Sequence, residues 1–207
     1  MAYTNFTLQE IRNKFNIKEI RVELFDNIEA IPISDWLKET LAMTKKIPMR
    51  SEKAKSELIV TPILVELRRR NDNFFTFFSG EALNVDSELG LSGECDFILT
   101  KDDARYGIDA PIISLVQAKK NDLELGVVQC AAQMIGAAQF NKNNNNPIDV
   151  IYGCVTTAEV WNFMKLEGNE LLIDENLYYF TEIEMVIGAF QKIIDYYKHT
   201  LSEMTVV

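Results

Sequence analysis

Residues 112–140, IISLVQAKKNDLELGVVQCAAQMIGAAQF, contain the change of periodicity that decides the fold. Residues 112–119 are mainly apolar up to Gln117 and Lys119, which predicts a buried strand. Residues 125–140 are rich in alanine and glycine, which predicts a helix that packs closely against its neighbour. A strand followed directly by a helix is typical of an α/β sheet.

The segments on either side of this unit predict further strands and helices. The predicted strands are residues 74–85, 93–100 and 148–156, followed by a short strand meander at 159–180. The predicted helices are residues 7–15, 35–43, 51–70 and 181–200. The order helix, three strands, helix, strand predicts a three-layer α/β sheet covered on both faces, with N-terminal helices before it and a C-terminal helix after it.

Local signals mark the ends of several of these elements. Thr7 and Glu10 form the T-x-x-E pattern of a capping box. Pro62 lies inside the predicted helix 51–70 and should kink or split it, because proline has no amide hydrogen. Residues 17–31 fit either a helix or a strand.

The length of 207 residues predicts one structural domain overall. Within it, we expect residues 1–50 to form an N-terminal helical extension packed on the core, and residues 51–207 to form the main α/β domain. Apolar residues make up 47% of the chain and charged residues 25%, which is typical of a globular protein. A chain of this length buries a full core without disulfides.

The three cysteines, Cys95, Cys130 and Cys154, lie among apolar residues and form no C-x-x-C pair, which predicts buried free thiols. Free thiols fit a reducing cytoplasm. The N-terminus lacks the apolar region of a signal peptide, and no apolar run reaches the roughly 18 residues of a membrane span. We therefore expect a cytoplasmic protein without a membrane partner.

The net charge of −10 argues against a protein that coats nucleic acid. The charge is uneven, however, because residues 45–70 contain eight basic and only three acidic side chains. This segment is either a solvated helix face or a local phosphate-binding surface. The first candidates for contact with nucleic acid are Lys53, Lys55, Arg68, Arg69 and Arg70.

The predicted strand 112–119 becomes polar at its C-terminal end, where sites in α/β sheets usually lie. Side chains two residues apart share a face of a strand, so Gln117 and Lys119 should point the same way, with Ile113 and Leu115 behind them. Pairing with strand 93–100 as a hairpin would bring a second polar group to this end.

That second group is Asp96, which stands between a cysteine and a phenylalanine in the strand 93–100. Strict alternation predicts one face with Glu94, Asp96 and Ile98 and the opposite face with Cys95, Phe97 and Leu99. An unpaired aspartate is costly to bury, and a cation is one partner that relieves the cost. The hairpin would place Asp96 near Gln117 and Lys119.

These residue types match the needs of phosphodiester hydrolysis. A hard divalent cation needs oxygen ligands, and the bound cation lowers the pKa of a water molecule. A nearby lysine stabilises the negative charge of the transition state. An aspartate, a carboxamide oxygen and a lysine on one pair of strands supply all three.

The order and spacing of these residues resemble the PD-(D/E)xK nuclease superfamily, the restriction endonuclease-like proteins. The matching pieces, within about residues 50–160, are Glu57 in SEKAKSELIVTPIL, Asp96 in SGECDFILT, and Gln117-Ala118-Lys119 in SLVQAKKND. The stretch IYGCVTTAEVWNFMKL also looks like bacterial members of this superfamily found near restriction-type systems. The resemblance implies a core of helix, three strands, helix and strand.

The resemblance also implies roles for single residues. Asp96 would bind Mg²⁺ (or Mn²⁺) directly, Gln117 would be the second ligand, and Glu57 would reach the metal or its water. Lys119 would position the attacking water or stabilise the transition state. Gln133, or Gln129 one turn earlier, lies where related nucleases often place a helical glutamine near the site.

Position 117 departs from the commoner pattern, because the family residue there is usually glutamate. A carboxamide oxygen ligates Mg²⁺ without bringing charge, so metal affinity should fall. Mrr-like restriction enzymes, regarded as active, resemble this chain in their Q-x-K motif. Glu94, on the predicted face of Asp96, is a candidate for the missing carboxylate.

Two functions follow from the resemblance. The first is a Mg²⁺-dependent DNA endonuclease of a defence, restriction or repair system, with a homodimer as the candidate assembly. The alternative is a nuclease-fold protein that has lost catalysis and serves as a nucleic-acid- or protein-binding module. A third reading is a structural partner whose acidic surface docks on a basic protein. His199, the only histidine, should lie on the surface, which argues against Ser-His-Asp and Cys-His chemistry.

Overall fold

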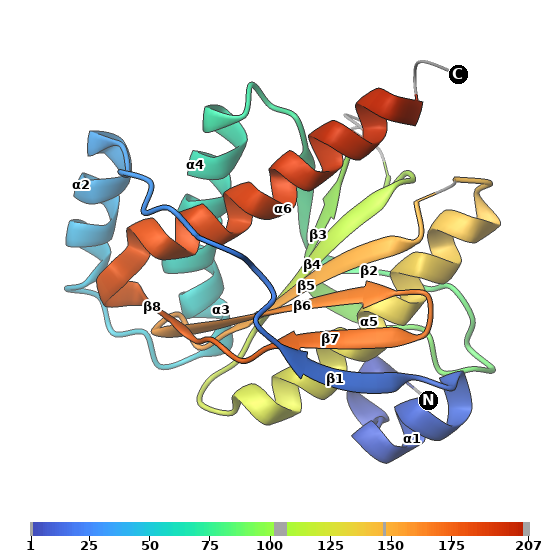
Figure 1. The fold of residues 1–207 in the computed structure, drawn as a ribbon. Helices are drawn as coiled ribbons and strands as arrows, with labels where there is room; N and C mark the ends of the chain where they lie inside the picture. The colour runs from blue at the N-terminus through green and yellow to red at the C-terminus, as the bar shows by residue number, and fades with distance from the viewer. Residues whose placement is uncertain (1, 102–106, 147, 205–207) are drawn as a thin grey trace.

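The computed structural model describes residues 2–101, 107–146 and 148–204. An eight-stranded mixed sheet runs through the molecule in the order β1-β7-β6-β5-β4-β3-β2, with β8 paired to β6 (Figure 1). The strands are β1 Lys18–Val22, β2 Thr76–Ala82, β3 Glu94–Thr100, β4 Ile112–Ala118, β5 Val150–Thr156, β6 Val160–Glu167, β7 Glu170–Asp174 and β8 Tyr178–Tyr179. The pairs β4–β5 and β1–β7 are parallel, and the other pairs are antiparallel.

Helices cover both faces of this sheet (Figure 1). The helical elements are η1 Tyr3–Asn5, α1 Leu8–Phe15, α2 Asp35–Thr44, α3 Glu52–Lys55, η2 Ser56–Val60, α4 Thr61–Arg70, α5 Leu123–Asn143, η3 Phe180–Glu182 and α6 Ile183–Met204. Helix α5, with η1 and α1, packs on one face, and α2, α4 and α6 pack on the other. The mixed α/β class predicted from the sequence is confirmed.

The β4–α5–β5 unit has the expected strand–helix–strand form. Gln117 pairs with Val155 in the parallel ladder, and the Lys119 amide donates to the Thr156 carbonyl at 2.7 Å, which extends the ladder past the end of β4. Small residues let α5 approach the sheet closely. Gly153 of β5 lies under α5, where an added Cβ would collide with Met134 Sδ and lie 2.9 Å from Cys130 Sγ.

Replacing Gly153 by alanine should therefore lower the free energy of unfolding by about 1–3 kcal/mol, because the new methyl overpacks the interface between α5 and β5. Urea denaturation measures this change. Gly107→Ala is the matched control, since an added Cβ there meets nothing within 4 Å. Equal loss of stability in both variants would contradict the close approach of α5 to β5.

The predicted helix 51–70 is split, as its proline suggested. The break lies before Pro62, in the π-helical segment η2, where the Thr61 amide donates to the Ser56 carbonyl five residues back. Pro62 then stands in the first turn of α4, where its missing amide hydrogen costs nothing. The split separates α3, next to the sheet end that carries Gln117, from α4.

The N-terminal fifty residues are more than a helical extension. Helix α1 begins with the predicted capping box, in which Thr7 and Glu10 bond each other's backbone amides. The ambiguous segment 17–31 contributes β1, which pairs with β7 at one edge of the sheet. Residues 1–50 therefore contribute to the same sheet as residues 51–207.

Three further expectations concern burial. All three cysteines are free and buried, as predicted. His199 is exposed, with 74% of its side chain accessible and Glu203 3.4 Å away. No helix in the described ranges combines the length and apolar character that crossing a bilayer requires.

Candidate active site

Asp96 and Gln117 meet where β3 and β4 separate. The antiparallel register of these strands ends at Phe97 opposite Val116, and beyond it the Asp96 carboxylate occupies the gap. Its Oδ2 accepts the Ala118 amide at 2.7 Å and a hydrogen bond from Gln117 Nε2. The structure therefore brings together the two residues that the predicted hairpin was expected to join.

Strict alternation does not hold on either strand, however. Cys95 packs with Ile98 in the cluster on the α5 face, whereas Phe97 belongs to the cluster on the opposite face. On β4, Leu115 lies on the α5 face and Ile113 on the other. A bulge between Leu99 and Thr100 shifts the β3–β4 register, and the predicted face assignment of Ile113 is wrong for this reason. The assignment of Cys95 is wrong because alternation on β3 breaks at Asp96, where the pairing with β4 ends.

Burial raises the pKa of Asp96, and this desolvation is the largest effect on it. The Ala118 amide and the Lys119 charge lower the pKa, whereas the nearby carboxylates Glu52 and Glu94 raise it. The net result is a raised pKa, so keeping this carboxylate ionised costs folding free energy. A bound cation would offset that cost.

This shift predicts a pH dependence of stability. A raised carboxyl pKa favours folding while the group is protonated, and the benefit is lost as the pH rises through the folded-state pKa. Asp96→Asn removes the ionisation, so the variant should gain stability relative to the wild type at neutral pH. The difference should shrink toward about pH 4, near the ordinary range of aspartate. Metal-free urea denaturation across this range tests it, and a pH-independent difference would contradict it.

Gln133 of α5 extends the contact between Asp96 and Gln117 into a chain of amides. Its Nε2 donates to Gln117 Oε1 at 3.0 Å and to the Glu94 carbonyl at 3.3 Å. Both glutamines are almost completely buried, with 2% of Gln117 and 1% of Gln133 exposed. Within the described residues, Gln133 Oε1 has no hydrogen-bond partner. Gln133 therefore lies where the helical glutamine was expected.

Lys119 lies just past the end of β4, half-buried beside α5. Its Nζ donates to Gln129 Oε1 at 2.7 Å. The glutamine oxygen holds the ammonium in place but carries no net charge, so the positive charge of Lys119 is retained. That charge lowers the pKa of Asp96, which shows that the two groups interact electrostatically.

The helix carboxylate that approaches the site is Glu52, which sequence reasoning missed. Glu52 accepts the Lys120 amide at 3.1 Å and raises the pKa of Asp96. Glu57 instead points to solvent, with 63% of its side chain exposed and Lys53 Nζ 3.8 Å away. The structure thus does not bring Glu57 to Asp96.

A periodicity signal distinguishes the two glutamates. Glu52 is three and seven residues before the buried positions Lys55 and Ile59, so it lies on the inward stripe of the helix. Glu57 is five residues after Glu52, which turns it by about 140° around an ideal helix. The phase of the helix therefore predicts that Glu52, and not Glu57, faces the site.

Glu94 is exposed at the start of β3 and reaches the site mainly through its backbone carbonyl, which accepts from Gln133. Its carboxylate raises the pKa of Asp96, so it lies within electrostatic range. Glu94 is therefore an auxiliary candidate at the edge of the site.

The basic candidates divide into two groups. Lys53 and Lys55 lie on α3, and Lys55 Nζ donates to the Lys120 carbonyl beside the site. The arginines lie at the far end of α4, beyond the π-helical segment η2 from Glu52.

Each arginine has a contact within the protein. Arg68 donates to the Phe75 carbonyl and Asn73 Oδ1, Arg70 donates to the Pro32 carbonyl and Glu66, and the Arg69 guanidinium lies 5.4 Å from the Trp36 ring centroid. These contacts hold neighbouring segments together. The structure therefore does not join the arginines to the site around Asp96.

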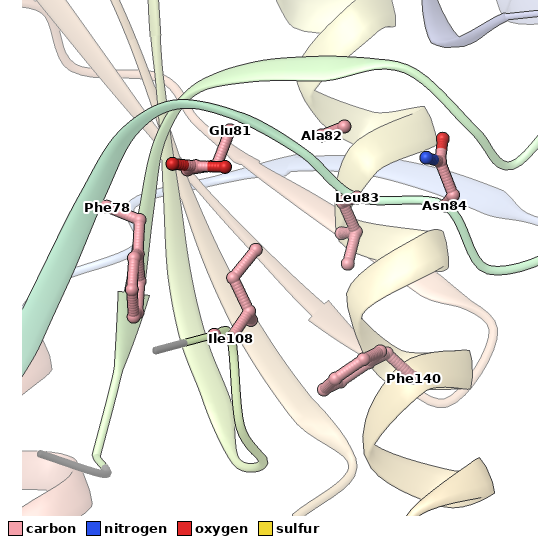
Figure 2. A pocket seen from close by; sticks show the side chains of 8 residues that line it. Phe78, Glu81, Ala82, Leu83, Asn84, Ile108 and Phe140 are labelled. Atoms are coloured by element: carbon pink, nitrogen blue, oxygen red, sulfur yellow. The ribbon is translucent and has the colours of Figure 1, made fainter. Parts of the chain in front are cut away.

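A separate hollow lies between β2 and the C-terminal half of α5 (Figure 2). Apolar side chains of Phe78, Leu83, Ile108 and Phe140 line it, and Glu81 lies at its margin. None of the predicted catalytic residues lines this hollow. A second pocket, beside Lys119, includes Glu52 and Gln129 in its wall and adjoins the site.

The oxygen atoms around Asp96 limit how a metal would bind. Among the described residues, no three acidic, histidine or cysteine side chains are grouped to hold a metal ion. A cation would therefore depend on Asp96, on Gln117 Oε1 and on water or phosphate oxygens. Mg²⁺ fits such a set, since it commonly keeps several waters and binds through one or two carboxylates.

The amide of Gln117 has the opposite orientation in the structure, with its nitrogen toward Asp96. Rotating the amide by half a turn exchanges nitrogen and oxygen and presents Oε1 beside the carboxylate. The buried oxygen of Gln133, which lacks a described partner, would then accept the Gln117 amide if Gln133 turned with it. The rotation would place one carboxylate and one carboxamide oxygen side by side, and turning Gln133 would give up its hydrogen bond to the Glu94 carbonyl.

Comparison of the chain with protein-family models, with curated proteins and with solved structures finds no match.

Proposed function

We propose that this protein is a Mg²⁺-dependent deoxyribonuclease of the PD-(D/E)xK type, acting in defence, restriction or repair. The observation that carries the proposal is the convergence of Asp96, Gln117 and Lys119 at the ends of β3 and β4. The element order α4, β2, β3, β4, α5, β5 supports it, because it matches the order expected of a restriction endonuclease-like core.

The residues have distinct tasks in this proposal. Asp96 and the rotated Gln117 amide hold the cation, which when bound supplies Lewis acidity and a more acidic water. Lys119 stabilises the charge that develops on the phosphate oxygens, and Gln129 fixes the direction of its ammonium. Glu52, whose charge acts on Asp96, would orient a water molecule near that carboxylate.

Cleavage of supercoiled plasmid and of single-stranded DNA, with Mg²⁺ or Mn²⁺, tests this function. Lys119→Ala should reduce the rate about 100-fold, the scale for loss of one charge-stabilising group. Lys142→Ala is the matched control, because Lys142 is an exposed lysine at the opposite end of α5. No cleavage by the wild type, or equal rates for the wild type and Lys119→Ala, would refute the proposal.

A second candidate is a catalytically impaired nuclease-fold protein that binds nucleic acid or protein. The observation that favours it is the state of Gln117, whose oxygen bonds Gln133 and whose nitrogen faces Asp96. Calorimetry with Mn²⁺ separates the two candidates. No binding at millimolar metal, together with no cleavage, would favour the binding module.

The setting of the activity is part of the same proposal. We place it in the cytoplasm, because the three buried thiols suit reducing conditions. DNA is the proposed partner, and a homodimer is the proposed assembly. Sedimentation with and without duplex DNA measures the assembly.

A further inference from the structure

A pocket of about 460 Å³ opens beside the ammonium of Lys119. Four segments far apart in the sequence form its wall: the N-terminal residues 3–6, the start of α3, the β4–α5 loop and the first turns of α5. The pocket therefore reaches the proposed catalytic lysine, and Asp96 is not among the residues that line it.

The wall of this pocket contains both apolar and charged groups. Leu125 and the half-buried Val128 provide accessible apolar surface, and Phe6, also in the wall, is buried. Lys119 and the exposed Lys120 provide cationic groups in the same wall. The wall also contains two carboxylates, Glu52 and Asp122, which accept the backbone amides of Lys120 and Leu125. Leu125 is 66% exposed, so its apolar side chain stands open to solvent in the same wall as the two lysines.

An apolar wall beside cations suits a nucleotide. The face of a nucleobase packs on apolar and aromatic side chains, and the phosphate pairs with lysine. A duplex instead keeps its bases stacked inside and presents its backbone, so a base must leave the stack to enter such a pocket. An unpaired strand fills the pocket without that cost.

We propose that this pocket binds the unpaired nucleotide next to the phosphate that is cut, so that the substrate is single-stranded DNA or a single-stranded segment of a longer DNA. The assignment of the neighbouring phosphate to Lys119 rests on the proposed function. Binding of the base itself does not, since it depends on Leu125 and Val128 rather than on a metal or on cleavage.

Fluorescence anisotropy in EDTA measures this binding without turnover. The probes are a labelled oligothymidylate and a labelled blunt DNA hairpin whose loop is a linker without bases. Leu125→Ser should weaken oligothymidylate binding at least fivefold and leave hairpin binding unchanged. The control is Leu177→Ser, since Leu177 is 44% exposed and follows β7, away from the pocket. Leu125 makes its helix-capping contact through its backbone amide, so the variant retains it.

The outcomes separate this inference from the proposed function. If binding of the single strand depends on Leu125 but no cleavage occurs, nucleotide binding in the pocket is supported and the nuclease activity is refuted. If cleavage depends on Lys119 but Leu125→Ser binds the single strand as tightly as the wild type, nucleotide binding in the pocket is refuted and the nuclease activity is supported. Equal affinity of the wild type for the hairpin and the single strand would also overturn the pocket.

Discussion

Asp96→Asn should abolish nearly all metal-dependent cleavage of DNA, with a loss on the order of 100- to 1000-fold, corresponding to several kcal/mol of transition-state stabilisation. Asparagine has the same shape and keeps an oxygen to accept the Ala118 amide at the gap between β3 and β4. It removes the negative charge that a hard cation needs from this ligand. The loss would therefore report on metal binding and not on misfolding.

Initial rates over a Mg²⁺ titration measure this effect. The control is Asp149→Asn, because Asp149 is exposed just before β5, at the other end of the sheet from Asp96. Thermal unfolding without metal should show Asp96→Asn to be at least as stable as the wild type, as the raised pKa of Asp96 requires. If Asp96→Asn cleaves DNA at the wild-type rate, Asp96 takes no part in the mechanism.

Gln117→Glu should increase the affinity for Mn²⁺ about tenfold or more, and it should destabilise the metal-free protein. Without metal, a second carboxylate stands against Asp96 in a buried position, and the hydrogen bond that Gln117 donates to it is lost. With metal, the two carboxylates share one cation. The same substitution thus has opposite effects in the two states.

Melting temperatures with EDTA and with Mn²⁺ test both effects in one experiment. The increase caused by Mn²⁺ should be larger in Gln117→Glu than in the wild type. Gln139→Glu is the control, since Gln139 lies on the outer part of α5 and bonds Asn143. An identical increase in all three proteins would show that position 117 does not face a metal.

Periodicity predicted much of the fold, because the signals were local or strongly apolar. The capping box at Thr7 and the small-residue helix that became α5 are both present. The segment 17–31 could not be assigned, since β1 gains its strand form from pairing with β7, a segment about 150 residues later in the chain.

The part of the candidate site that depends on strand pairing was predictable from the sequence. The part that depends on which face of a strand or helix a residue occupies was not. Asp96 and Gln117 meet because β3 and β4 pair, but a bulge altered which neighbouring residues share their faces. The choice of Glu57 over Glu52 neglected helical phase in the first turns of a short helix.

Charge alone also did not predict the contacts at the end of α4. Three consecutive arginines suggested a phosphate-binding surface, but Arg68 and Arg70 make hydrogen bonds to backbone carbonyls of neighbouring segments. Such contacts depend on tertiary structure and leave no pattern in a single sequence. The orientation of the Gln117 amide is likewise set by Gln133, a residue of another element.

The most direct test of a metal site at Asp96 is anomalous diffraction from crystals soaked in Mn²⁺. We predict a single strong peak about 2.0–2.3 Å from an Asp96 carboxylate oxygen and from Gln117 Oε1, with the Gln117 amide turned half a rotation from its orientation toward Asp96 described above. A fully soaked crystal that shows no peak there, with Gln117 Nε2 still donating to Asp96, would contradict the metal-dependent nuclease.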